Sequence, residues 1–379
     1  MMKIPALIDC HVHFREPGLT HKADMETESA AAFAGGVHTV CEMPNTNPPA
    51  TSVEAFQDKV ERAKRIKNVD VRFFFGITEL PHLEGLRAVW ADPALRARCC
   101  GVKIYFDHST GNQGASADVI AEAFRVCGEL DIPLVAHCED AHMNDEAKRV
   151  VTQDIGGSGV ALHSLHRPPG SEAQAIEHAI RLARQHGTPF HVAHLSTMQG
   201  IDLVRGAKAE GLRITCEVAP HHLFLSTQDY GTLGTLGKMN PPLREADHQR
   251  VLWEGIADGT VDCISTDHAP HTLQEKQIDN PLDAPSGVPG VETMLPLLLT
   301  VAAGGWPHPR GERCIESFTI DDIVRLCFAN PNRIFRLGKD GSDVITIDSD
   351  AQWAITANQL HSKCGWTPYE GWKVRGKVV

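Results

Sequence analysis

The amino-acid sequence predicts an α/β fold in which eight parallel strands form a TIM barrel, a (β/α)₈ barrel, with helices on the outside. Short runs rich in valine, isoleucine and phenylalanine recur along most of the chain. These runs are apolar at nearly every position, as expected for parallel strands that are covered on both faces. Segments with helix signals separate the runs, and this alternation is typical of α/β barrels. An open doubly wound sheet is the alternative, but it would need a glycine-rich phosphate loop after its first strand, and none is visible.

Eight runs are the predicted strands of the barrel. They cover residues 6–13, 37–43, 71–77, 101–106, 132–137, 190–195, 213–219 and 261–265. The segment 24–34 is a predicted helix that ends at Gly35 and Gly36, because glycine favours the end of a helix. A second helix is predicted to open with a capping box at Ser171 and to close at Gly187.

A small β-rich unit is expected after the barrel. A helix-like stretch covers 320–337, and residues 343–347 and 371–379 have the pattern of strands. We therefore expect a barrel domain over residues 1–340 and a small, mostly C-terminal β appendage over residues 341–379.

Composition and charge restrict the class of protein. Of the 379 residues, 42% are hydrophobic and 22% are charged, and the formal net charge of −12 argues against a nucleic-acid partner. No apolar run reaches the ~18–20 residues that cross a bilayer, and the N-terminus enters core-like sequence without room for a secretory signal. We expect a cytoplasmic protein without a membrane partner. Its eleven cysteines follow no framework spacing and are expected to be reduced.

Chemically active side chains gather at the ends of six predicted strands. In a barrel these ends meet at one mouth, where catalytic residues lie. Each group alone is weak evidence, because a single histidine at a strand end more often has a structural role, and an isolated lysine often extends along an apolar surface. Their convergence indicates a metal-dependent enzyme. The groups are His11 and His13, Lys103, His137, His194, Glu217 with His221 and His222, and Asp267 with His268 and His271.

These ligand types predict two zinc ions per chain. The two histidines of the first strand would hold one ion, and His137 and His194 the other. Two dications about 3.5–4 Å apart repel each other, so they need bridging anions. Lys103 can bridge only if its amine has added carbon dioxide to give a carbamate, and a hydroxide would be the second bridge and the nucleophile. Asp267 would complete the first ion's shell and remain able to take up a proton.

Longer motifs surround these groups. They are DCHVHFREPG at 9–18, MPNT at 43–46, TCEVAPHHL at 215–223, KMNPPLR at 238–244 and STDHAPH at 265–271, with WTP at 366–368. Through them nearly the whole sequence resembles the dihydroorotases of the amidohydrolase superfamily, particularly the dihydroorotase domain of the animal multifunctional pyrimidine-synthesis protein. Runs of this length are far more specific than an isolated pair of histidines.

The resemblance implies a reaction and a substrate. The reaction is the zinc-dependent, reversible cyclisation of N-carbamoyl-L-aspartate to L-dihydroorotate in pyrimidine biosynthesis, with Asp267 as the catalytic residue and Lys103 carboxylated. In the family, the positions that match Arg15, Asn45 and His271 hold the substrate carboxylate, and those that match Asn240 and the backbone around Ser286 and Gly287 contact the ring amide. The planar guanidinium of Arg15 independently suits a carboxylate.

Two further expectations depend on the resemblance. Thr110 lies in a segment of small polar residues after the Lys103 strand, where some dihydroorotases have a loop that closes over substrate; a plain surface loop is the alternative. Ala193 stands where the animal domain has a cysteine that helps to hold an extra metal, so no third ion is expected through that position.

Other members of the superfamily are the nearest alternatives. An allantoinase or dihydropyrimidinase would share the metal ligands, but the motif around Arg15 favours a substrate that carries a carboxylate. An inactive dihydroorotase-like scaffold for aspartate carbamoyltransferase would typically have lost metal ligands, and all six are present here. The protein partners that we expect are a second copy of the chain, in a homodimer, and possible association with an aspartate carbamoyltransferase.

Overall fold

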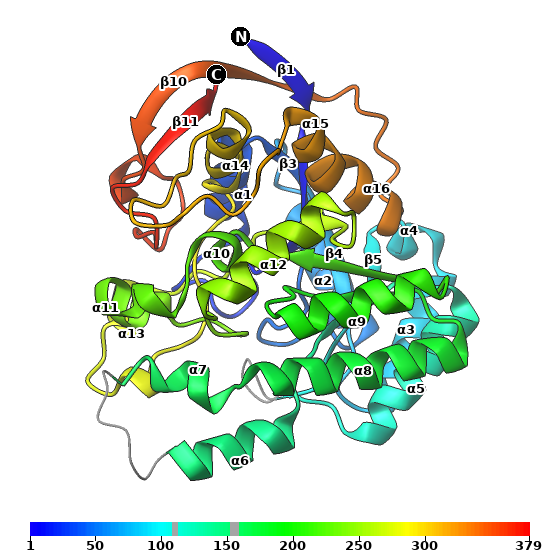
Figure 1. Ribbon diagram of the computed structural model, residues 1–379. Helices are drawn as coiled ribbons and strands as arrows, with labels where there is room; N and C mark the ends of the chain where they lie inside the picture. The colour runs from blue at the N-terminus through cyan, green and yellow to red at the C-terminus, as the bar shows by residue number, and fades with distance from the viewer. Residues whose placement is uncertain (108–112, 152–158) are drawn as a thin grey trace.

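The computed structural model describes residues 1–107, 113–151 and 159–379, and eight parallel strands form its centre (Figure 1). Neighbouring strands pair in chain order, from β2 to β9. Beyond β9, a hydrogen bond of 2.7 Å from the His13 amide to the His268 carbonyl joins the end of the barrel to its beginning. The predicted barrel and its eight strands are confirmed. The strands are β2 (Leu7–Val12), β3 (Val37–Glu42), β4 (Asp70–Gly76), β5 (Cys99–Tyr105), β6 (Leu134–His137), β7 (Phe190–Val192), β8 (Ile214–Val218) and β9 (Cys263–Ile264).

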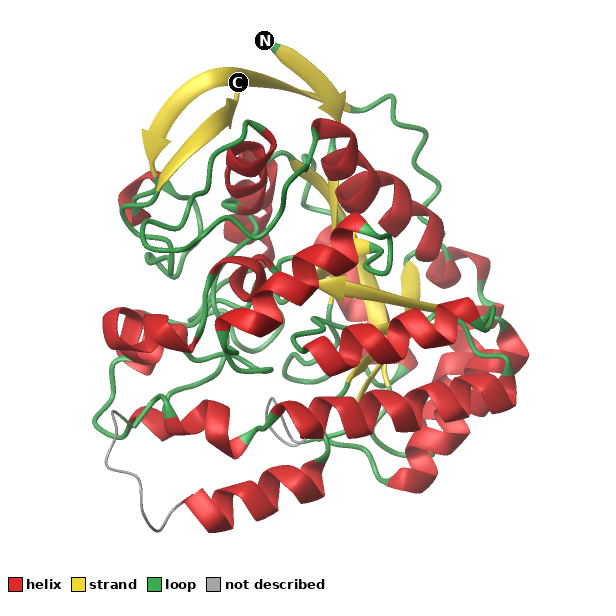
Figure 2. Ribbon diagram, viewed as in Figure 1, coloured by secondary structure: helices red, strands yellow, loops and turns green. Residues whose placement is uncertain are grey.

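Helices surround these strands and fill the connections between them (Figure 2). None of the helices in the described part of the chain is long and apolar enough to cross a membrane. The α-helices are α1 (Met25–Ala34), α2 (Val53–Ala63), α3 (His82–Ala91), α4 (Pro93–Arg96), α5 (Ala117–Leu130), α6 (Ala141–Val151), α7 (Leu162–His166), α8 (Pro169–His186), α9 (Met198–Ala209), α10 (Pro220–Phe224), α11 (Tyr230–Leu233), α12 (Ala246–Ala257), α13 (Leu273–Lys276), α14 (Met294–Ala302), α15 (Ile320–Val324) and α16 (Asn330–Ile334). The shorter turns are η1 (Thr227–Asp229), η2 (Gly234–Gly237), η3 (Pro281–Asp283), the π-helical η4 (Arg325–Ala329) and η5 (Ala357–Gln359).

The predicted end of helix α1 is confirmed, whereas the predicted start of helix α8 is wrong. The Asp24 side chain caps the amides at the start of α1, and the helix ends at Gly35 as predicted. The predicted capping box at Ser171 is wrong, because α8 already begins at Pro169. Proline is favoured in the first turn of a helix, since its missing N–H would have no partner there. The Ser171 hydroxyl instead donates to the Asp140 carbonyl, and α8 ends at Gly187 in the left-handed conformation.

The hydrophobic core has two layers. A large cluster fills the space between strands and helices, and a smaller one fills the inside of the barrel. The inner cluster is closed by Phe335 at the end of α16, whose ring meets Phe74 edge to face at 5.5 Å. The barrel interior is therefore filled by side chains and is not an open pore. The inner cluster consists of Ile8, Cys10, Cys41, Met43, Phe74, Cys100, Val135, Ala193, Cys263, Phe335 and Leu337.

A separate three-stranded antiparallel sheet forms the small β unit. Its order is β1 (Met2–Pro5), β10 (Val344–Ala354) and β11 (Lys373–Val378), and Met2 pairs with Ile347. The sheet thus takes one strand from the N-terminal part of the chain and two from the C-terminal part (Figure 1). It packs on α14 through Gly376, where any side chain would collide with Leu299. The division at residue 340 stays a prediction.

Candidate metal centre and substrate pocket

The ends of the barrel strands form a narrow cavity of ≈30 Å³. All six predicted metal ligands line it, together with four of the six predicted substrate contacts. Asn45 and His271 lie directly behind this lining, and Thr110 lies outside the described residues. The lining residues are His11, His13, Arg15, Lys103, Tyr105, His137, His194, Asn240, Asp267, Ala269, Ser286 and Gly287.

Three ligand atoms meet on one side of this cavity. His13 Nε2 lies 3.0 Å and His11 Nε2 3.3 Å from Asp267 Oδ1. Burial keeps the pKa of both histidines below the ordinary value, so the rings are neutral ligands at neutral pH. This trio satisfies the geometric requirement for a cation site, with two imidazoles and one carboxylate.

Two further histidines meet on the other side. His137 Nδ1 lies 3.1 Å from His194 Nε2, while His137 Nε2 donates to Glu139 at 2.8 Å. His194 Nδ1 is buried and has no hydrogen-bond partner among the described residues. Burial lowers the pKa of both rings. Two neutral imidazoles that point at one spot are suited to a shared metal ion.

Lys103 lines the same cavity as the two pairs, and its head group is unsatisfied. Its side chain is 1% exposed, and Nζ has no hydrogen-bond partner within the described ranges of the chain. Burial lowers its pKa to about 8, although Glu217 and Asp267 act in the opposite direction. A buried ammonium without partners is unfavourable, so the site suits a neutral or chemically modified amine better. The unpartnered lysine and the two pairs of converging imidazoles fit the metal pair that the sequence predicts.

The backbone at the mouth is strained where the predicted site residues lie. Arg15, His194 and Asp267 have φ angles of +66°, +32° and +47°. Side chains with a Cβ rarely adopt this left-handed region, which costs on the order of 1–3 kcal/mol per residue, and such strain clusters at functional sites. The strain turns these three side chains toward the cavity after their strands have ended.

Glu217 links the two halves of the metal centre. Its Oε1 accepts a hydrogen bond from His11 Nδ1 and another, at 3.2 Å, from the backbone amide of His194. Its Oε2 lies 3.2 Å from His191 Nε2. Burial opposes ionisation, but His11 and His191 hold the pKa of Glu217 well below its ordinary value. The carboxylate thus fixes the ring of His11 with Nε2 free to bind a metal.

Sequence reasoning missed the buried ion pair that orients His137. The Arg167 guanidinium donates to Glu139 at 2.8 Å and to Asp107 at 2.7 Å. Despite burial, Arg167 and His137 hold the pKa of Glu139 well below its ordinary value. The position of Glu139, two residues after a strand-end histidine, is a signal that could have identified it. Arg167 lies in a connection between helices, and nothing in its local pattern indicates a partner.

The predicted carboxylate pocket is positively charged. Arg15 is 3% exposed and donates from Nε to the Pro270 carbonyl at 3.0 Å, and its guanidinium lies 3.0 Å from His271 Nε2. Lys22 donates to His271 Nδ1 at 3.1 Å. Burial, followed by Arg15 and Lys22, holds the pKa of His271 well below its ordinary value. The ring is therefore neutral and donates from Nε2 to the Ser286 carbonyl at 3.0 Å.

His13 fixes Asn45, whereas Asn240 and the loop at Gly287 are fixed by groups that the sequence did not indicate. His163 donates to Asn240 Oδ1 at 2.8 Å, and Asn45 Oδ1 lies 2.7 Å from His13 Nδ1. Lys276 is buried and donates to the carbonyls of Lys238, Pro285 and Gly287. Gly287 has φ +138°, and a Cβ there would lie 2.6 Å from the Ala269 carbonyl oxygen, so no other residue fits without a shift.

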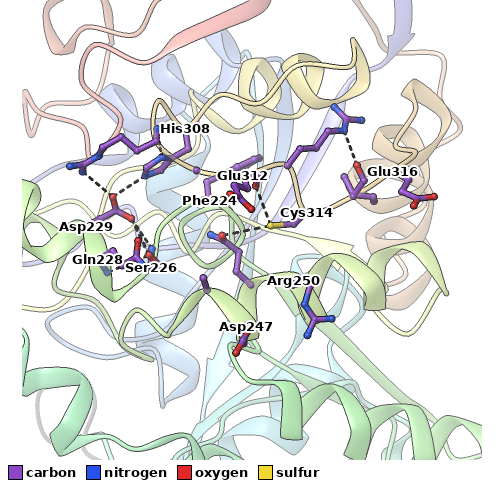
Figure 3. A pocket seen from close by; sticks show the side chains of 16 residues that line it. Phe224, Ser226, Gln228, Asp229, Asp247, Arg250, His308, Glu312, Cys314 and Glu316 are labelled. Atoms are coloured by element: carbon purple, nitrogen blue, oxygen red, sulfur yellow. Dashed lines mark hydrogen bonds and ion pairs between the residues drawn. The ribbon is translucent and has the colours of Figure 1, made fainter.

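A much larger hollow of ≈970 Å³ lies elsewhere on the surface (Figure 3). None of the predicted site residues lines it. Two of its basic groups pair with Asp229: His308 Nε2 donates to it at 2.8 Å, and Arg310 lies 3.4 Å from it. Neither of the two groups of possible metal ligands found among the described residues lies in this hollow, whereas one of them lines the small cavity at the barrel mouth.

Comparisons with known proteins show which family this chain resembles. A family model described as dihydro-orotase-like matches residues 1–200. The dihydroorotase of Halobacterium salinarum is 39% identical over 97% of this chain and 82% of its own length. That of Methanosarcina mazei is 37% identical over 98% of this chain and 80% of its own. The multifunctional protein CAD of Squalus acanthias is 33% identical over 100% of this chain and 14% of its own.

The fold also resembles solved structures of cyclic amidohydrolases. The L-hydantoinase (dihydropyrimidinase) of Arthrobacter aurescens superposes with a TM-score of 0.90 at 26% identity, over 100% of this chain and 83% of that one. The similarity covers the barrel and the small sheet alike.

Proposed function

Because this chain belongs to the dihydroorotase family of cyclic amidohydrolases, we propose that it interconverts N-carbamoyl-L-aspartate and L-dihydroorotate in pyrimidine biosynthesis. One juxtaposition carries the proposal: the buried guanidinium of Arg15 lines the same cavity as the convergent ligands His11, His13 and Asp267. A metal centre opens cyclic amides, and the arginine selects among them the one with a carboxylate.

The metal ligands are part of the same proposal. His11, His13 and Asp267 would hold one zinc ion, His137 and His194 the second, and carboxylated Lys103 would lie between them. The unpartnered Lys103 Nζ and the convergence of His137 Nδ1 with His194 Nε2 support this arrangement. When bound, such a pair polarises a carbonyl and supplies a hydroxide nucleophile at neutral pH. The chain's own residues bind the substrate and move the proton.

We assign binding of the substrate carboxylate to the positively charged pocket around Arg15. Arg15 offers a planar pair of donors to the carboxylate, with His271 and Asn45 beside it. Asn240 and the backbone at Ser286 and Gly287 would contact the ring amide, since they line the same cavity. These contacts would hold the ring with its reacting carbonyl over the histidine cluster, and the narrow cavity would exclude bulk water from it.

Asp267 is the proposed general acid and base. Burial raises its pKa, which favours a carboxylate that can take up a proton during the reaction. In ring opening, Asp267 would accept the nucleophile's proton and give it to the leaving ring nitrogen. In ring closure it would take the proton from the attacking nitrogen. Its positive φ supports this role, since the strain holds the carboxylate over the cavity.

A related cyclic amidase is the alternative, because hydantoinases share the fold. The test is to assay ring opening of dihydroorotate, dihydrouracil, hydantoin and allantoin side by side with the zinc-loaded protein. We expect turnover of dihydroorotate to exceed that of the others, which have no carboxylate for Arg15. Faster turnover of an uncharged ring would refute the assignment. Absence of both metal and turnover would instead favour an inactive scaffold.

The protein partners and the compartment belong to the proposal as well. We propose a homodimer that works in the cytoplasm, and an association with an aspartate carbamoyltransferase, which would supply the substrate. The support is the resemblance to dihydroorotases and to the multifunctional animal protein. Light scattering of the protein alone and with an aspartate carbamoyltransferase of the same source would test both partners.

A further inference from the structure

A second group of metal-binding side chains lies inside the barrel, beneath the mouth. It consists of Cys10 on β2, His191 on β7 and Glu217 on β8, each at most 1% exposed. The barrel brings these three residues together from distant parts of the sequence, and their ligand atoms lie within 4.8 Å of one another. Branched apolar side chains normally fill the inside of a barrel at this level. A thiol, an imidazole and a carboxylate in contact there call for a specific function.

The distances in this cluster suit a single metal ion. Cys10 Sγ lies 3.3 Å and His191 Nε2 3.2 Å from Glu217 Oε2. Two ligand atoms at about 2.0 and 2.3 Å from a tetrahedral zinc ion are about 3.5 Å apart. Small movements of the three side chains would therefore be enough to seat an ion among them. Thiolate, imidazole and carboxylate are also the ligands that zinc takes in proteins.

The hydrogen bonds of His191 are compatible with such a role. Its Nδ1 lies 2.8 Å from Thr215 Oγ1, and the Thr215 hydroxyl can donate to the Phe190 carbonyl at 3.4 Å. Without an ion, His191 Nε2 donates to Glu217 Oε2. With the Thr215 hydroxyl hydrogen on the Phe190 carbonyl, the ring proton can instead lie on Nδ1 and be donated to Thr215, which leaves a lone pair on Nε2 for a metal ion. An ion between Nε2 and the carboxylate would then take the place of this hydrogen bond.

Charge balance favours the same assignment. A dication bound to one thiolate and one carboxylate leaves no net charge in the barrel interior, where an unbalanced charge would be costly. The thiol of Cys263 lies beside that of Cys10 and is a candidate fourth ligand. Because these residues are buried, the ion would have no open position for substrate, as is typical of structural zinc.

We propose that Cys10, His191 and Glu217 bind a third metal ion, a structural zinc distinct from the pair proposed at the mouth. Its connection to the mouth is Glu217, whose other oxygen accepts a hydrogen bond from His11. The ion would fix this carboxylate on one side, and the carboxylate would in turn fix the ring of His11 on the other. The third ion is thus a support for the catalytic centre and has no part in substrate binding.

The test uses the zinc content and zinc environment of the whole chain. Protein loaded with zinc and then dialysed is expected to retain three ions per chain, and X-ray absorption at the zinc edge to show a sulfur neighbour at about 2.3 Å. Cys10→Ser is expected to retain two ions and to lose the sulfur neighbour, because the ligands proposed at the mouth contain no sulfur. Cys41→Ser is the matched control, since Cys41 is also buried in the inner cluster but is not one of the three ligands. It should keep three ions and the sulfur signal.

Two results would overturn the proposal. One is wild-type zinc with no sulfur neighbour, and the other is a sulfur neighbour that survives in Cys10→Ser. If Cys10→Ser does not fold, cobalt titration of the wild-type chain decides the question. Cobalt bound to a thiolate has a charge-transfer absorption that cobalt bound only by nitrogen and oxygen lacks, so its absence overturns the site. These measurements need no substrate, and their outcome is independent of the proposed dihydroorotase activity.

Discussion

The Nδ1 atom of His137 lies 3.1 Å from the Nε2 atom of His194 at the barrel mouth. His137 donates its single ring N–H, on Nε2, to Glu139. Its Nδ1 therefore faces His194 with a lone pair. Two rings in this arrangement share either a proton or a metal ion. In the proposed enzyme the two rings share a metal ion.

Replacing either ring should remove a metal ion and the activity together. We expect His194→Ala to lose at least one zinc ion per chain and to lower turnover of dihydroorotate by at least about 10³-fold, because the nucleophile depends on the metal pair. Zinc analysis and a ring-opening assay of the same sample measure both effects. His142→Ala, on the exposed face of α6, is the control and should behave as wild type. Full activity in His194→Ala would exclude the proposed second ion.

Lys103 should carry a carbamate. Native mass spectrometry of the chain in bicarbonate is expected to show the added mass of one carbon dioxide, which acid removes. Lys103→Ala should lose zinc and activity, and short carboxylic acids such as acetate or propionate should restore part of both, because they can provide the missing bridging oxygens. Lys64→Ala, with an exposed lysine on α2's C-terminal side, serves as the control. Zinc and turnover that persist in Lys103→Ala would contradict the bridge.

Arg15 should determine the choice of substrate. Arg15→Gln removes the charged partner of the substrate carboxylate, at a cost of about 2–4 kcal/mol, or roughly 30- to 900-fold in kcat/KM for dihydroorotate. Arg15→Lys should lie between Gln and wild type, since it keeps the charge and loses the planar fork. Arg184→Gln, which breaks an exposed ion pair with Glu210, should have no effect. Equal losses for dihydroorotate and for an uncharged ring would mean that Arg15 acts on the fold and not on the carboxylate.

Lys276 should affect catalysis by positioning the loop around Gly287. Lys276→Met keeps the length of the side chain but loses the three hydrogen bonds to carbonyl groups around Gly287. We expect kcat/KM to fall by about 10- to 100-fold through a misplaced ring contact, with KM affected most and zinc content unchanged. Steady-state kinetics and metal analysis distinguish this from damage at the metal centre. A loss of zinc with an unchanged KM would show that the loop is not the affected part.

The equilibrium of the reaction should depend on pH. Carbamoyl aspartate carries two carboxylates and dihydroorotate one, so closure of the ring consumes a proton. Above the pKa of these carboxylates, the ratio of open to closed form should rise about tenfold per pH unit, so that acid favours closure and alkali favours opening. The ratio is measured from both directions, and doubling the protein concentration should not change it. A constant ratio would mean that another reaction is being catalysed.

The barrel and the residues at its mouth could be predicted because both depend on short patterns. An apolar run identifies a parallel strand, and a polar residue at its end lies at the mouth of the barrel, as His11 and His137 do. The supporting residues could not be predicted in this way. Arg167 reaches Glu139 from a connection between two helices, and its place depends on how that connection packs.

The sequence also could not predict which side chains meet inside the barrel. Ala193 alone argued against an additional metal, because a thiol was expected at that one position. The strands curve around a common interior, and Cys10 from β2 and Ala193 after β7 belong to the same inner cluster. A thiol absent from position 193 is thus present in the same interior at Cys10, and only the closed arrangement of strands shows this.

The pairing of β1 with β10 has a consequence for how the chain folds during synthesis. Met2 cannot meet Ile347 until the eight strands of the barrel, which lie between them in the sequence, have left the ribosome. Contacts between such distant segments form late, because the loop that they close is long. A nascent chain would thus carry its first strand unpaired through most of translation. The small sheet would form at the end, and its assembly would mark a barrel that is already complete.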